Sequence, residues 1–404
     1  MSRQEHSTKS ALSNVRVFAI AETLAGGIPQ TVLALMGAEV IKVEYRRKIG
    51  RADALRPWQF WMPAPLVASG ANKRAITLDL SYPEGLELAR RLVKISNVVT
   101  TSVRPGVMDR LGLGYSELKK IKSDIIMFCS SGHGGTGPES SYRGYAGIYS
   151  VLSGLAELVG YEDSSPTDTR SSSDIRAGLY GAVAILAALN HWQRTGEGQV
   201  IDFSQREANT TPVADAIMDY TMNKRNQTRT GNRSAFMAPH NCYRCRGEDR
   251  WISIAVGTQE EWKALCGIMG NPDWSQEARF ADENSRWQNQ EELDKLVDAW
   301  TKDFESIELM GILQKAGVAA MPSFNSKDLC EDPHLKERNA FSIVEQPGSG
   351  KKYSLLSPVW RLSATPARVT RCFPEVGQDN EYVYGELLGL SPKEMADLAA
   401  KGVI

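Results

Sequence analysis

VRVFAIAETLAGGIPQTVLALMGAEVIKVE, residues 15–44, is the stretch of this 404-residue chain that decides its fold. It opens on a short apolar run, Val15–Ala21, which is typical of a buried strand. Ile28–Met36 has helical spacing and ends at Gly37, and Glu39–Glu44 is a second strand. Because short apolar strands alternate with helices, we expect an α/β fold whose parallel sheet carries helices on both faces.

The same alternation continues through the first two hundred residues. Apolar runs predict strands, and runs with helical spacing predict helices, at Ile76–Leu80, Pro83–Ser96, Asn97–Val103, Tyr115–Ser123, Ile125–Ser131, Ile175–Trp192 and Gln199–Ser204. Apolar residues lie almost all round the helix Ile175–Trp192, which predicts that it is buried inside a large protein.

The character of the chain changes after Asn223. Asn223–Ser234 is polar and basic and is typical of a linker, and a second unit begins near Met237. Its strand and helix patterns predict a smaller α+β domain. The last seventy residues contain short strands followed by a predicted helix at Pro392–Ala400.

Composition excludes several classes of protein. The 47 Lys and Arg residues nearly balance 48 Asp and Glu, so the net charge of −1 gives no bulk attraction for nucleic acid or anionic lipid. The first fourteen residues are polar, and the apolar stretch Ala177–Leu189 is shorter than a membrane span. We therefore expect a cytoplasmic protein with neither a nucleic-acid nor a membrane partner.

Metal and nucleotide motifs are sparse. Cys242 and Cys245 form a single CxxC pair without the second pair of ligands that structural zinc needs, and the five histidines are scattered. The sequence contains neither a P-loop nor the GxSxG elbow of α/β-hydrolases. We expect no metal in this protein.

A glycine-rich segment follows the predicted strand Ile125–Ser131. Gly132, Gly134 and Gly137 form GxGxxG, but Pro138 follows at once and the strand is not the opening one. This context disfavours a dinucleotide site. A glycine loop beside another ligand and a plain turn both remain open.

Two kinds of charged residue are candidates for chemistry. Asp174 stands where the predicted buried helix begins; it is either an N-cap or an ionised nucleophile at the positive end of the helix dipole, and both roles are compatible. Arg46 and Arg104 lie just past strand ends. Ligands of open α/β sheets bind there, and several cations suit a polyphosphate ligand.

The chain resembles the class III CoA-transferases, of the formyl-CoA transferase and carnitine CoA-transferase type. The resemblance covers nearly the whole chain. Its motifs are GAEVIKVE (Gly37–Glu44), NKRAITLDL (Asn72–Leu80), RPGVMDRLGLGY (Arg104–Tyr115), SSGHGGTGP (Ser130–Pro138), Asp174 with AALNHWQRTGEGQ (Ala187–Gln199), RFADENSRWQNQ (Arg279–Gln290) and LLGLSPKEMADLAAKGVI (Leu387–Ile404).

The resemblance implies a Rossmann-like large domain formed by residues 1–225 and 331–404, with a small α+β domain inserted at 226–330. It implies an interlocked dimer, either a homodimer or a heteromer with a homologous chain. It places the catalytic aspartate at Asp174. It places the CoA- and substrate-binding residues at Ala25, Arg46, Leu78, Ser102, Val103, Arg104, Arg110, Ser131, Gly132, His133 and Gly134.

The resemblance also implies reversible CoA transfer from an acyl-CoA, which we expect to be succinyl-CoA, to a carboxylic acid. An aspartyl-CoA thioester on Asp174 would be the intermediate, backbone N–H groups of residues 132–135 would stabilise oxyanions, and CoA thioesters would be substrates with no cofactor. Two alternatives are an acyl-CoA racemase that uses His133 and an aspartate as bases, and a non-catalytic partner subunit.

The acceptor acid is the least determined feature. Pro57–Leu66 reads PWQFWMPAPL, and its aromatic residues either pack into the core or an interface or line an acyl pocket. The long glycine loop of formyl-CoA transferases is absent from the second half of the chain, which disfavours oxalate. We expect an aromatic or aryl-substituted dicarboxylic acid, such as benzylsuccinate.

Overall fold

The computed structural model describes residues 10–20, 24–44, 70–167, 172–346 and 350–404. The chain divides into two compact units. The first consists of Met1–Ala156, Asp168–Met222 and Lys336–Ile404, and the second of Glu157–Thr167 and Asn223–Leu335. The small helices α9 (Leu155–Leu158) and α18 (Pro333–Glu337) lie where the chain passes from one unit to the other.

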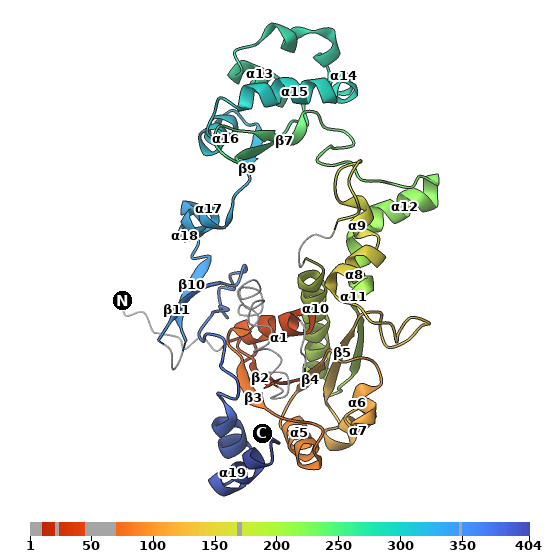
Figure 1. The fold of residues 1–404 in the computed structure, drawn as a ribbon, viewed down its shortest axis with the longest axis vertical. Coiled ribbons are helices and arrows are strands. Elements are labelled where there is room, and N and C mark those ends of the chain that lie inside the picture. Colours follow the sequence, from red (N-terminus) through yellow and green to blue (C-terminus); the bar gives the residue numbers. More distant parts are fainter. Residues whose placement is uncertain (1–9, 21–23, 45–69, 168–171, 347–349) are drawn as a thin grey trace. The chain divides into compact units, whose positions relative to one another are not determined.

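A six-stranded sheet organises the first unit (Figure 1). Its strands are β1 (Arg16–Ile20), β2 (Glu39–Glu44), β3 (Arg74–Thr77), β4 (Val98–Thr101), β5 (Ile126–Ser131) and β6 (Val200–Ser204). The order is β3-β2-β1-β4-β5-β6 and every pairing is parallel. The predicted α/β class and Rossmann-like sheet are confirmed.

Helices cover both faces of this sheet because alternate strand residues point to opposite sides and both sets are apolar. Phe18 and Ile20 belong to the core that also contains Leu88 of α5 and the carboxyl-terminal residue Ile404. Val17 packs on the other face, in the core of α1 and α10. The helices of this unit are α1 (Leu24–Leu35), α5 (Pro83–Lys94), α6 (Val107–Arg110), α7 (Tyr115–Ile121), α8 (Ala146–Leu152), α10 (Ser172–Thr195), α11 (Gln205–Thr210), α12 (Ala214–Asn223) and α19 (Pro392–Ala400).

The carboxyl-terminal segment packs onto the sheet of the first unit. The Asp379 carboxylate accepts a hydrogen bond from the Ala75 backbone N–H (2.9 Å) and pairs with Arg74 (3.1 Å) and Arg371 (2.8 Å). The segment also contains the antiparallel pair β10 (Phe341–Glu345) and β11 (Lys352–Leu356) and a π-helical stretch, Glu381–Leu387. Residues more than 300 positions apart thereby share one core.

Helix α10 is buried on one side only, so the prediction that it is buried all round is wrong for this chain. Gly178 and Gly181 let it approach α1 and β5; a Cβ on Gly178 would lie 2.5 Å from the Ile28 Cβ. On its other side Leu179 is 46% exposed and Val183 64%. By length and composition α10 would also pass as a membrane span, but a helix packed into a protein core passes the same test.

The second unit is a small α+β arrangement. Its antiparallel sheet is β7 (His240–Arg244), β8 (Trp251–Ala255) and β9 (Ala319–Pro322). One face packs in an apolar core with α13 (Gln259–Ile268), α15 (Gln290–Thr301) and α16 (Ser306–Lys315). Further helices are α14 (Glu283–Gln288) and α17 (Ser326–Glu331).

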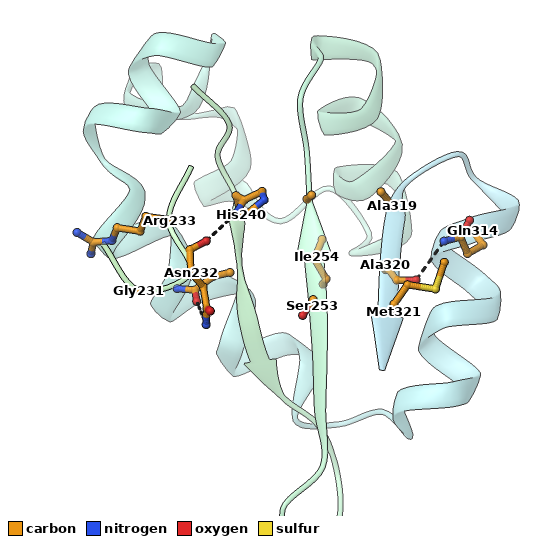
Figure 2. Close-up of a pocket in the computed structure, with 12 residues that line it drawn as sticks. Gly231, Asn232, Arg233, His240, Ser253, Ile254, Gln314, Ala319, Ala320 and Met321 are labelled. Carbon is orange, nitrogen blue, oxygen red and sulfur yellow. Dashed lines mark hydrogen bonds between the residues drawn. The ribbon is translucent and has the colours of Figure 1, made fainter. Parts of the chain in front are cut away.

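The sheet of the second unit has a hollow of about 410 Å³ beside its strands (Figure 2). His240 and Asn232 point toward each other there, with 2.6 Å between the His240 Nδ1 and the Asn232 carbonyl oxygen. Gln314 donates a hydrogen bond to the Ala320 carbonyl (3.1 Å). These polar groups bond to neighbouring backbone, and none of the predicted site residues lines the hollow.

Candidate active site

An open cavity of about 370 Å³ lies in the first unit, beyond the carboxyl ends of β4 and β5. Residues from five separate parts of the chain line it. They are Ser102, Val103, Arg104, Pro105, Ser131, Gly132, Ser140, Tyr142, Arg143, Gly144, Tyr145, Ala146, Tyr149, Asp174 and Gln205. The structure thus brings six of the predicted site residues, Asp174 among them, to one cavity at the edge of the sheet where ligands of such folds bind.

Asp174 lies in the first turn of α10, half-buried. The helix begins at Ser172, so Asp174 is two residues inside it and is not the N-cap that its position in the sequence suggested. The turn is anchored, because Ser173 donates to the Ala146 carbonyl (3.0 Å) and Asn209 donates to the Ser173 carbonyl (3.3 Å). The positive end of the helix dipole favours the ionised carboxylate.

The glycine loop is fixed by contacts with β6 and α11. Gly134 and Gly137 adopt φ of +85° and +86°, which glycine tolerates best. The backbone N–H of Arg206 donates to the Gly132 carbonyl (2.9 Å), and that of Gly135 donates to the Asp202 carboxylate (2.7 Å). Since Asp202 already occupies the Gly135 N–H, this group is not the oxyanion donor expected from the sequence.

His133 belongs to the glycine loop and is not among the residues that line the described cavity. Its side chain is 5% exposed and packs edge-on against Tyr142 and Tyr149, with ring centroids 6.1 and 5.5 Å away. Its Nδ1 is 3.8 Å from Glu139 and forms no hydrogen bond. A racemase base has to reach the carbon next to the thioester, and this geometry does not place His133 for that task.

Tyr149 is a cavity residue that sequence reasoning missed. It is 7% exposed, and burial, followed by the charge of Asp174, raises the pKa of its phenol. Its ring fits against two glycines: a Cβ on Gly132 would lie 2.2 Å from the Tyr149 hydroxyl, and a Cβ on Gly144 2.7 Å from its ring. The sequence pattern alone shows neither contact.

The other predicted binding residues have different surroundings. Arg104 is exposed and lines the cavity, whereas Arg110 is exposed in α6, with Nη1 3.3 Å from the position of a Gly106 Cβ. Ala25 and Leu78 are buried, at 2% and 1% exposure. Arg46, like the segment Pro57–Leu66, lies outside the described residues.

A second cavity of about 230 Å³ adjoins the first and shares Val103, Arg104, Pro105 and Ser131 with it. Cys129 lines it, and burial, with smaller contributions from Asp202 and Asp109, raises the pKa of this thiol to about 12. The thiol is therefore protonated near neutral pH, which disfavours Cys129 as a nucleophile. No three His, Cys, Asp or Glu side chains of the described ranges are grouped to hold a metal ion.

Comparison with known proteins decides the family. A sequence model described as CoA-transferase family III matches residues 12–380. This chain belongs to CoA-transferase family III. The resemblance drawn from the sequence and the assignment as a class III CoA-transferase are confirmed.

Individual relatives match this CoA-transferase over almost its full length. It is 34% identical over 402 residues to a succinyl-CoA–D-citramalate CoA-transferase of Chloroflexus aurantiacus, covering 97% of this chain and 98% of that protein. It is 29% identical to the β subunit of a succinyl-CoA–L-malate CoA-transferase of the same organism, covering 98% and 99%. A CaiB/BaiF family crystal structure from Brucella suis superposes with a TM-score of 0.85 at 29% identity, covering 94% and 100%.

Proposed function

We propose that this enzyme transfers CoA reversibly from succinyl-CoA to a dicarboxylic acid through a thioester on Asp174. The observation that carries the proposal is the cavity that places Asp174 beside Arg104 and the loop residues Ser131 and Gly132, at the carboxyl edge of the sheet. Two relatives named for succinyl-CoA as donor support the choice of donor.

The reaction follows from nucleophilic catalysis. The Asp174 carboxylate attacks the thioester carbonyl, and collapse of the adduct expels CoA thiolate and leaves a mixed anhydride. The thiolate then attacks the aspartyl carbonyl, which releases succinate and forms the aspartyl-CoA thioester. The acceptor carboxylate attacks that thioester, and the thiolate returns to the acceptor acyl group. Every bond that breaks is replaced, and no outside oxidant or reductant is needed.

The acceptor is tested with a panel of acids. Both named relatives transfer CoA to four- or five-carbon dicarboxylic acids, citramalate and malate. We expect acyl-CoA products, followed by mass spectrometry with succinyl-CoA as donor, from dicarboxylic acids and none from matched monocarboxylic acids. Transfer to monocarboxylic acids alone would overturn the proposed substrate class.

An aryl-substituted acceptor such as benzylsuccinate is the narrower part of the proposal, and it depends on Trp58, Phe60 and Trp61 of the segment Pro57–Leu66. Apolar and aromatic side chains line most small-molecule pockets. We expect benzylsuccinate to exceed methylsuccinate in kcat/KM, and Trp61→Ala to reduce that ratio. Equal ratios in the wild type and the variant would assign the segment to packing instead.

Arg104 is the cation best placed for the phosphates of CoA, since it lines both cavities. A charge-assisted hydrogen bond contributes about 1.5–3 kcal/mol. We expect Arg104→Ala to raise the KM for succinyl-CoA about tenfold or more, and Arg110→Ala to raise it too, with the preference among acceptors unchanged. Arg90→Ala in α5 is the control, because Arg90 lines neither cavity and is not among the CoA-binding positions that the family resemblance implies. Arg110 also lines neither cavity, and its expected effect rests on that resemblance. A KM unaltered in the Arg104 and Arg110 variants would make these residues surface charges.

The assembly is proposed from exposed apolar side chains of the first unit. They lie on α8, α10 and α12, and more than two-fifths of each is exposed: Ile148, Val151, Leu152, Ile175, Leu179, Val183, Ile217, Met218 and Met222. A contiguous exposed apolar surface marks protein–protein contact, and we propose that these side chains form one. A second copy of this chain or a homologous chain would cover this surface. The homologous chain is included because one relative is named as the β subunit of its enzyme.

A further inference from the structure

Close packing against neighbouring residues holds the phenol of Tyr149 at the wall of the cavity that contains Asp174. Its hydroxyl fills the place where a Gly132 side chain would begin, and its ring fills the place of a Gly144 side chain. The His133 ring packs edge-on against it from the loop, with centroids 5.5 Å apart. With 7% exposure and three close neighbours, the side chain has one well-defined position.

Tyr149 and Asp174 are fixed relative to each other by the contact between α8 and α10. The Ser173 hydroxyl donates to the carbonyl of Ala146, the first residue of α8. Ala146 and Tyr149 are three residues apart and so lie on the same face of that helix. Both Tyr149 and Asp174 line the cavity, and the charge of Asp174 acts on the phenol.

The Tyr149 hydroxyl can donate its proton in a hydrogen bond to a bound substrate. The neighbouring Gly144 backbone N–H acts to lower the pKa of the phenol, and because an amide N–H can only donate, it acts on the hydroxyl oxygen and not on its proton. Burial and the Asp174 carboxylate raise the pKa of the phenol above its ordinary range, so it stays protonated across the neutral range.

We propose that Tyr149 is a further catalytic residue, whose hydroxyl donates a hydrogen bond to the oxygen of the carbonyl that reacts at Asp174. The inference rests on the proposed function. When the Asp174 carboxylate oxygen bonds to the thioester carbon, the carbonyl π pair moves onto the carbonyl oxygen. On collapse that pair re-forms the double bond, the carbon–sulfur bond breaks and CoA leaves as thiolate. Tyr149 stabilises the transient negative oxygen without giving up its proton.

A second hydroxyl is the rival donor at this cavity. Ser131 Oγ is buried, lacks a hydrogen-bond partner in the described structure, and belongs to a residue that lines both cavities. Ser131 is the last residue of β5, whereas Tyr149 lies in α8, so the two hydroxyls belong to different elements. Single variants of each therefore separate their contributions.

The test uses Tyr149→Phe, which keeps the ring between the two glycines and removes the hydroxyl alone. Loss of one preorganised donor to an oxyanion lowers kcat on the order of 10²-fold. We expect that loss in kcat, a KM for succinyl-CoA within about threefold of the wild type, and an equal slowing of Asp174 acylation in single-turnover mass spectrometry. Tyr382→Phe is the matched control, because it removes a hydroxyl bonded to Glu39 (2.8 Å) in the same unit, outside both cavities.

The outcomes are separable. If wild-type enzyme acylates Asp174 and Tyr149→Phe does so equally fast, Tyr149 has no catalytic role and the proposed function stands. If Ser131→Ala instead loses kcat while Tyr149→Phe does not, the oxyanion donor is Ser131 and the inference is overturned. If the wild type never acylates Asp174, the proposed function itself fails and the inference fails with it.

Discussion

Replacing Asp174 with alanine is expected to abolish CoA transfer while leaving the protein folded. The Asp174 carboxylate lies in the first turn of α10 and lines the cavity, and the proposed mechanism has no other nucleophile to form the anhydride. Removing a carboxylate from a first helical turn costs only about 0.3–1 kcal/mol of stability. Initial rates of acyl-CoA formation and a thermal unfolding midpoint measure the two effects separately.

A matched variant separates chemistry from helix stability. Glu308 also stands two residues into its helix, α16, and is exposed in the second unit. Glu308→Ala should cost a similar free energy of unfolding and leave transfer unchanged. Hydroxylamine should trap Asp174 of the wild type only after succinyl-CoA is added. Transfer by Asp174→Ala at a rate near that of the wild type would reject the aspartyl mechanism.

Val183→Asp is expected to separate the proposed assembly into single chains. Val183 is 64% exposed on the side of α10 that faces away from the sheet, in line with Leu179 one turn before. Transferring a carboxylate out of water into a protein contact costs several kcal/mol per ion, and a two-fold interface would contain it twice. Light scattering at micromolar concentration should give the mass of two chains for the wild type and of one for the variant.

The control for this substitution is Ile307→Asp. Ile307 is exposed to a similar extent, at 57%, but lies in the first turn of α16, where a carboxylate suits the helix dipole. It should retain the mass of the wild type. A wild-type chain that is a monomer at this concentration would contradict the proposed assembly, and an unchanged mass for Val183→Asp would show that the interface lies elsewhere. Native mass spectrometry of an assembly with a homologous chain would identify a heteromer.

The alternation of strands and helices could be predicted from the sequence because hydrophobic periodicity is a local property of the chain. Strands β1, β2, β4, β5 and β6 fall within a few residues of the predicted runs. The third strand is Arg74–Thr77 rather than Ile76–Leu80. Its start is set by pairing with Ile41 of β2, and its end comes before Leu78, which turns into the core against the carboxyl-terminal segment. Such long-range pairing leaves no local mark on the sequence.

The sequence by itself determined the α/β class, the family motifs and Asp174 as the candidate nucleophile, because spacing and residue type carry these. Only the tertiary structure decided which groups share a cavity. It placed Tyr149 against Gly132 and in the same cavity as Asp174. It also bonded the Gly135 N–H to Asp202 and packed the His133 ring against Tyr149, outside the cavity lining. The physical reason is that a cavity is made where several strands end together. Its chemistry depends on packing between segments that the chain keeps tens of residues apart.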